Sequence, residues 1–239
     1  MARRRFFVEA VRKGVAELRG DEARHLTRVL RVEAGQQYEI SDQQSAYLAE
    51  IAEARGVRVL FRVLEPIASA EPPVRITLLP ALIKFDRFEW LVEKATELGV
   101  DRILPVEAAR SEKGLMEASR KRAERWQRIA RESSQQSRRL RAPEIRPAAR
   151  FAAALAEPAD YRYRLEEAGA PVLLRRLPAE HTEPATVALL LGPEGGWTTE
   201  EREQAAAAGW EPVSLGPQLL RAETAAAAAI AIVMNAWCG

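Results

Sequence analysis

The stretch TVALLLGPEGGWTTEE, residues 186 to 201, joins an apolar run to a polar segment through a turn with three glycines and a proline. Its first part is a short apolar run, which is typical of a strand buried on both faces of a sheet. Its last part contains a capping box from Thr198 to Glu201, which predicts the start of a helix. The GPEGG turn between them therefore lies at the carboxyl end of a central strand, where open α/β sheets bind their ligands.

The backbone of this turn is bare. Gly192, Gly195 and Gly196 have no side chains to obstruct a ligand, and they permit positive φ angles. The turn lacks the Lys-Ser/Thr of a phosphate-binding loop and does not have the spacing of a dinucleotide fingerprint. Taken alone, it indicates a ligand without naming one, and a purely structural corner is the alternative.

A second glycine-proline turn follows near the end of the chain. Residues 210–215 predict another strand, residues 216–223 a loop, and residues 224–237 a helix so apolar that it must be buried in the fold or against another subunit. We expect the two turns to form the walls of one pocket. Arg221 and Glu223 in the second turn are either an ion pair at the helix N-terminus or catalytic groups of the pocket.

Strands and helices alternate over the second part of the chain, which predicts an α/β domain with a largely parallel sheet. The pattern predicts strands over 74–82 and 101–108 and helices over 85–98 and 119–140, with Gly99 as a left-handed helix terminator. Residues 151–171 predict a short helix and a loop with no chemistry. Lys84 and Asp86 follow the first of these strands, and Asp86 is expected either to cap the helix or to contact a ligand.

A proline-rich joint, EPIASAEPPV at residues 65–74, separates this region from the first part of the chain. Short alternating segments before it predict a small β-rich unit with one helix over 21–31. We therefore expect two domains, residues 1–72 and residues 73–239.

The charge of the chain is unevenly distributed. Its net charge is +2, but residues 1–31 and 119–150 together hold +13 and the remainder holds −11. Such segregation is the electrostatic footprint of a nucleic-acid binder, and two solvated helix faces are the alternative. Arginine outnumbers lysine 31 to 5, which suits bidentate phosphate contacts.

Composition sets the remaining bounds. The lone Cys238 cannot form an internal disulfide and no apolar stretch opens the chain as a signal peptide would, so a cytoplasmic protein is expected. The apolar segment 225–237 is shorter than the roughly 20 residues that span a bilayer, so no membrane partner is expected. Two scattered histidines and one cysteine give no metal-site spacing.

Five blocks of the sequence, taken together, resemble one known family. The family is the bacterial 16S ribosomal RNA uracil-N3 methyltransferase family of the SPOUT superfamily, and the blocks occur in the same order in both. Along this chain they are RHLTRVLRVEAGQ, KFDRFEWLVEKATELGV, RIARESSQQSRRLRAPEI, LLLGPEGGW and LGPQLLRAET. The resemblance implies an amino-terminal PUA-like β-barrel that binds RNA. It also implies an α/β domain with a carboxyl-terminal trefoil knot that holds S-adenosylmethionine, a homodimer, and a uridine of 16S ribosomal RNA, within the small ribosomal subunit, as substrate.

The chemistry of the implied reaction, the family's loops and the basic stretches together give expected roles for individual residues. Arg221 would stabilise a uracil anion, and Glu223 would accept the N3 proton or orient Arg221. The family's cofactor loops match Leu191, Gly192, Pro193, Glu194, Gly195, Gly196, Leu215, Gly216, Leu219, Leu220 and Thr224. The residues expected to contact RNA are Arg3, Arg4, Arg5, Arg24, His25, Arg28, Arg31 and Arg139.

The roles of two single positions are open. His25 matches a histidine of the family and is either structural or functional, and Gln135 stands where the family commonly has an acidic residue. Two other functions are compatible with the sequence. They are an RNA-binding module without catalysis, and an enzyme or nucleotide-binding protein that uses the same crevice without the basic stretches.

Overall fold

The computed structural model describes residues 4–69, 71–181 and 183–238. The chain forms two compact units. The first unit contains Met1–Glu71 together with Ser134–Ala142, and the second contains Pro72–Ser133 and Pro143–Gly239. Sequence alone assigns residues 134–142 to the second domain, whereas their contacts group them with the first unit.

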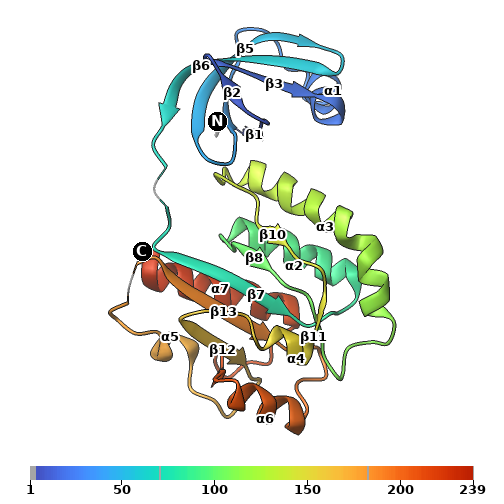
Figure 1. Ribbon diagram of the computed structural model, residues 1–239, viewed down its shortest axis with the longest axis vertical. Helices are drawn as coiled ribbons and strands as arrows, with labels where there is room; N and C mark the ends of the chain where they lie inside the picture. The colour runs from blue at the N-terminus through green and yellow to red at the C-terminus, as the bar shows by residue number, and fades with distance from the viewer. Residues whose placement is uncertain (1–3, 70, 182, 239) are drawn as a thin grey trace. The chain divides into compact units, whose positions relative to one another are not determined.

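A six-stranded sheet forms the first unit, in the order β1-β4-β5-β6-β3-β2. β1 and β4 are parallel and the other neighbours are antiparallel. The elements, most of them labelled in Figure 1, are β1 (Arg5–Phe7), β2 (Val11–Arg12), β3 (Val15–Arg19), α1 (Gly20–Arg28), β4 (Gln37–Ser41), β5 (Ala46–Arg55) and β6 (Arg58–Ile67). The predicted β-rich unit with one helix is thereby confirmed.

The core of this unit lies between the sheet and α1. Ala23 and Leu26 of α1 are buried with Phe61 and other side chains of the strands. Residues 134–142 are attached to the same unit by polar contacts: the Ser41 hydroxyl donates to the Leu140 carbonyl at 2.6 Å, and Arg138 pairs with Glu39.

The second unit contains a parallel six-stranded sheet in the order β10-β8-β7-β13-β12-β14. Its strands are β7 (Val74–Pro80), β8 (Arg102–Ile103), β10 (Glu144–Ile145), β12 (Tyr161–Leu165), β13 (Ala185–Leu191) and β14 (Glu211–Val213). A separate pair joins β9 (Val106–Glu107) to β11 (Ala149–Arg150). Its helices are α2 (Phe85–Glu97), α3 (Leu115–Gln136), α4 (Phe151–Ala154), α5 (Leu173–Arg176), α6 (Thr199–Ala207) and α7 (Ala222–Cys238). The alternation of strands and helices confirms the predicted α/β class.

β13 is buried on both faces, as its apolar run predicts. Leu189 and Leu191 belong to the core that also contains side chains of α2 and α7. Ala188 and Leu190 belong to the opposite core, which contains side chains of α4 and α6. Successive side chains of a strand point to opposite faces, so a strand covered on both sides needs apolar residues at every position.

The local predictions in this unit are confirmed with three corrections. The helix predicted over 119–140 is α3, Leu115–Gln136, so it begins and ends four residues earlier than predicted. Gly99 has a φ of +102° after α2, as expected of a helix terminator. The predicted strand 101–108 is divided into β8 and β9. The prediction of a helix and loop over 151–171 is wrong in part, because residues 161–165 form β12, a strand inside the sheet between β13 and β14.

Helix α7 follows the edge strand β14 and returns across the sheet. It packs on α2, β7, β13 and α5. Ala229, Ile230 and Val233 are completely buried along one side of it. The strong apolar character of residues 224–237 is therefore explained by packing within the unit, together with the half-buried Ile232 and Met234.

Candidate functional site

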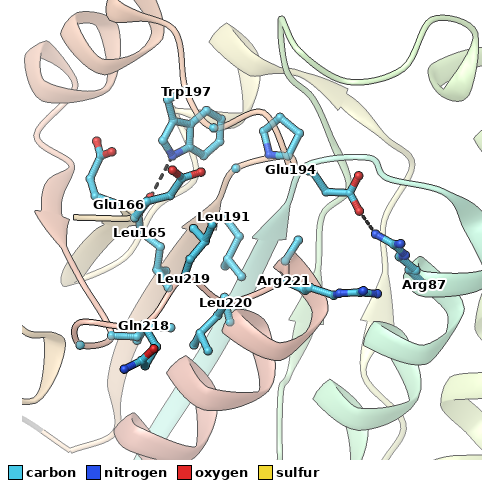
Figure 2. Close-up of a pocket in the computed structure, with 18 of the residues that line it drawn as sticks. Arg87, Leu165, Glu166, Leu191, Glu194, Trp197, Gln218, Leu219, Leu220 and Arg221 are labelled. Carbon is cyan, nitrogen blue, oxygen red and sulfur yellow. Dashed lines mark hydrogen bonds and ion pairs between the residues drawn. The ribbon is translucent and has the colours of Figure 1, made fainter.

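A cavity of about 400 Å³ lies where β12, β13 and β14 end. This volume is in the range of small-molecule sites. Three chain segments and the first turn of α2 supply its lining: Arg87, Leu165, Glu166, Glu167, Leu191, Gly192, Pro193, Glu194, Gly196, Trp197, Arg202, Leu215, Gly216, Gln218, Leu219, Leu220, Arg221, Ala222 and Ala225. Figure 2 shows most of these residues around the cavity. The two glycine-proline turns thus meet at one site, as the sequence predicts.

The GPEGG turn has a well-defined conformation. The Gly196 N–H donates to the Pro193 carbonyl at 2.8 Å, and Gly196 has a φ of +66°, which favours glycine. The predicted capping box of Thr198 and Glu201 is present at the start of α6. Trp197 is buried beneath the turn and its indole N–H donates to the Leu165 carbonyl at 3.0 Å. The turn is therefore joined to the end of β12.

One wall of the cavity is apolar. Leu191 ends β13, and Leu219 and Leu220 come from the second turn. Leu219 has 75% of its surface exposed, although it is a large apolar residue. An exposed leucine beside a cavity is ready to pack against the flat face of a ligand, because burying its side chain would be favourable.

Charged side chains border two sides of the cavity. Arg87 of α2 forms an ion pair with Glu194 of the turn, and Figure 2 shows Arg221 on that same side. No ion pair of Arg221 is found within the described parts of the chain. On the other side, Glu166 is paired with the buried Arg164 at 2.7 Å and with Arg202 at 3.1 Å. The side that carries Arg221 is therefore the one with an available cation.

The structure places the predicted cofactor residues around the cavity with two exceptions. Gly195 faces away from it, toward the side chain of Arg110, and Thr224 is exposed in the first turn of α7. Of the predicted catalytic pair, Arg221 lines the cavity and Glu223 does not. The Oε2 atom of Glu223 is buried and has no hydrogen-bond partner among the described residues, so the ion pair considered from the sequence is not formed there.

β12 and α2 contribute residues to the cavity that the sequence pattern does not predict there. Leu165, Glu166 and Glu167 lie at the end of β12, within the segment predicted to carry no chemistry. The alternating pattern YRYRL at 161–165 was the available signal, because aromatic residues in alternation favour a strand. Arg87 reads as a solvent-facing position of its helix, and only the fold brings it to Glu194.

The residues predicted to contact RNA lie near α1, in the segment 134–142, and in the amino-terminal arm. Arg24, His25 and Arg28 are exposed on α1, and the exposed Arg31 follows the helix with a φ of +49°. Arg139 is half-buried in the segment attached to the first unit.

The predicted amino-terminal arm needs correction. Arg3 lies outside the described residues, and Arg4 is half-buried. Arg5 is part of β1, only 7% exposed, and its guanidinium donates to Glu39 at 2.9 Å. Burial and pairing make Arg5 a structural residue of the sheet, because a buried charge needs its partner.

The described residues contain no group of three His, Cys, Asp or Glu residues placed to hold a metal ion. Among the same residues, no helix has the length and apolar character needed to cross a membrane.

Comparison with known proteins gives consistent matches over both units. The RNA methyltransferase domain family matches residues 70–234, and the RNA methyltransferase PUA domain family matches residues 18–64. The ribosomal RNA small subunit methyltransferase E of Mycobacterium bovis is 33% identical over 242 residues, which cover 92% of this chain and 86% of that protein. The protein of the same name from Bacillus subtilis is 29% identical over 236 residues and 92% of each chain.

Solved structures show the same similarity. The crystal structure of a ribosomal RNA small subunit methyltransferase E from Neisseria gonorrhoeae, bound to S-adenosyl methionine, superimposes with a TM-score of 0.89. The two chains are 29% identical, and the match covers 99% of this chain and 98% of the other.

Proposed function

This chain belongs to the RNA methyltransferase family, and from that premise we propose that it methylates N3 of a uridine in 16S ribosomal RNA of the small subunit, with S-adenosylmethionine as the methyl donor. The observation that carries the proposal is the cavity at the ends of β12, β13 and β14, lined by both glycine-proline turns. The names of the relatives support the ribosomal RNA substrate, and the Neisseria gonorrhoeae structure supports the donor. The choice of uracil N3 rests on the family resemblance of the sequence.

The residues present fit this donor. S-adenosylmethionine has a flat adenine ring, a ribose and a charged methionine part. Leu219 and Leu220 offer an apolar surface to the ring, and Gly192 and Gly196 add no side chain to the wall of the cavity. Carboxylates such as Glu167 also line the cavity and would attract the positive charge of a sulfonium. When bound, the donor would supply a methyl carbon attached to that sulfonium.

The chain's own residues would handle the proton and the negative charge. Uracil N3 carries a proton that must leave before the nitrogen can take a methyl group. Arg221, with its available guanidinium, would stabilise the negative charge that develops on the uracil oxygens. Glu194 lines the cavity on the same side as Arg221, which supports Glu194 rather than Glu223 as the acceptor of the N3 proton.

RNA binding is assigned in this proposal to the first unit. The exposed Arg24, Arg28 and Arg31 would contact phosphates, and His25 and the half-buried Arg139 would lie at the border of that surface. Arg4 is half-buried, so it is a weaker contributor. The match of residues 18–64 to a PUA domain family supports a PUA-like barrel for this sheet.

Three finer features complete the proposal. α7 follows the edge strand β14 and packs on β7, and in the sheet β12 and β13 lie between these two strands. This path across the sheet suits a carboxyl-terminal trefoil knot. The homodimer rests on the family resemblance of the sequence. We also propose that the protein works in the cytoplasm, where small subunits are its substrate.

Labelled methyl transfer tests the function. The protein is incubated with methyl-labelled S-adenosylmethionine and unmethylated small subunits, and the RNA is digested to nucleosides. We expect label in 3-methyluridine. Label in a cytidine or on a ribose hydroxyl would contradict the substrate. RNA binding without any transfer would indicate a binding module instead.

A further inference from the structure

The loop of residues 108–111, which follows β9, supports the GPEGG turn from outside the cavity. The Arg110 guanidinium donates to the Gly195 carbonyl at 2.5 Å and reaches the Trp197 carbonyl at 3.5 Å. The neighbouring Ala109 N–H donates to Glu201 Oε1 at 2.7 Å. None of these contacts involves a residue of the second glycine-proline turn. The GPEGG turn is therefore held on its outer side by a separate segment.

This support matters because the turn contains two adjacent glycines. Gly195 and Gly196 have more conformational freedom than other residues, so their peptide groups rotate easily unless they are held. The Gly196 N–H is fixed by the Pro193 carbonyl. The Gly195 carbonyl is held by Arg110, through a charge-assisted hydrogen bond of the stronger kind.

Packing adds to the hydrogen bonds. A Cβ atom at Gly195 would lie 3.3 Å from Cδ and 3.5 Å from Cβ of Arg110. The aliphatic part of Arg110 thus lies directly against the glycine. Arg110 therefore holds the turn in two ways, by hydrogen bonds to its carbonyls and by van der Waals contact with Gly195.

We propose that Arg110 is a positioning residue for the methyl donor. By holding the Gly195 and Trp197 carbonyls, it keeps residues 192–197 in the shape that receives the donor, without touching the donor itself. This inference rests on the proposed function, because it takes S-adenosylmethionine as the ligand of the cavity. Arg110 orders residues 192–197 before the donor binds. Removing Arg110 should therefore lower the affinity for the donor.

Titration calorimetry with S-adenosylhomocysteine tests the inference. The wild-type protein is compared with Arg110→Ala, Arg110→Lys and Arg175→Ala. Arg175 is the matched control, an exposed arginine of α5 that does not line the cavity. We expect Arg110→Ala to weaken binding about tenfold, which corresponds to about 1.4 kcal/mol. Arg110→Lys should recover part of the loss, because an ammonium still donates to a carbonyl.

Steady-state kinetics and thermal unfolding separate positioning from structural damage. For Arg110→Ala, KM for S-adenosylmethionine should rise about tenfold while kcat at saturation changes less than about twofold. Its Tm should stay close to that of Arg175→Ala, because Arg110 is exposed.

Three results would overturn this inference. They are unchanged affinity in Arg110→Ala, a loss confined to kcat, and a loss of affinity that Arg110→Lys does not relieve and that comes with a lower Tm than Arg175→Ala. Failure of the wild-type protein to bind S-adenosylhomocysteine would instead overturn the proposed function. The two failures are therefore distinguishable.

Discussion

Gly192 is the position where a single methyl group should disturb the site most. A Cβ atom there would lie 3.1 Å from Cε2 and 3.3 Å from Nε1 of Trp197. The indole has no room to retreat: it is 1% exposed, its N–H donates to the Leu165 carbonyl, and it packs against Phe151 at 5.3 Å between ring centroids. Gly192→Ala must therefore move either the turn or the buried ring.

We expect Gly192→Ala to lower the free energy of unfolding by about 1 to 3 kcal/mol, the usual cost of an extra methyl group in a well-packed core. The Tm should fall by roughly 2 to 4 °C for each kcal/mol in a domain of this size. Affinity for S-adenosylhomocysteine should also fall, because the cheapest response is a shift of residues 192–197.

Gly195→Ala is the matched control. Its new Cβ atom would meet the exposed side chain of Arg110 at 3.3 Å, and neither glycine has a positive φ. Displacing Arg110 should weaken donor binding, as in Arg110→Ala, but it should not lower stability. We expect a change in stability within about 0.5 kcal/mol, as for other exposed substitutions. Urea unfolding followed by tryptophan fluorescence measures both variants. Equal stability of Gly192→Ala and Gly195→Ala would refute the reasoning, because Trp197 would then not fix the turn.

Three further predictions concern the catalytic group, a buried phenol and the RNA surface. Arg221→Ala should lower labelled methyl transfer by about 100- to 1000-fold and leave affinity for S-adenosylhomocysteine nearly unchanged, because the guanidinium acts on the developing charge; a normal rate would contradict its role. Burial raises the pKa of Tyr163 from 10.0 to about 12, so its contribution to stability is complete below pH 10 and is lost as the pH rises toward 12. The free energy of unfolding, measured in urea at pH 9 and at pH 11, should therefore fall less for Tyr163→Phe than for the wild-type protein. An equal fall in both proteins would argue against this assignment. Replacing Arg24 and Arg28 together by alanine should reduce the slope of log affinity for ribosomal RNA against log salt by roughly 1.4 to 1.8, and an unchanged slope would exclude phosphate contacts there.

The local features of the fold could be predicted from the sequence because they depend on neighbouring residues. The capping box of Thr198 and Glu201 and the left-handed Gly99 each require only a few adjacent positions. The buried strand β13 follows from an uninterrupted apolar run. The meeting of two glycine-proline turns could also be inferred, because parallel strands end at the same edge of a sheet.

Residues that act through distant partners could not be assigned in this way. Arg5 belongs to a basic cluster in the sequence, yet its buried pairing with Glu39 depends on β1 lying beside β4. Glu223 is near Arg221 in sequence, yet it does not line the cavity and its Oε2 atom is buried. A side chain's direction depends on the packing of its whole helix, which sequence distance does not give.

Hydrophobic period, helix caps and glycine freedom are local properties, so they already indicate the α/β class, the bare turn at the end of a buried strand and the second turn beside it. The set of residues that surround the cavity depends instead on the folded chain. Arg87 reaches Glu194 from α2, β12 adds Leu165 to Glu167, and Arg110 holds the turn from outside. These groups are far apart along the chain, and their contacts exist only after the sheet has brought its strands and the connecting loops together.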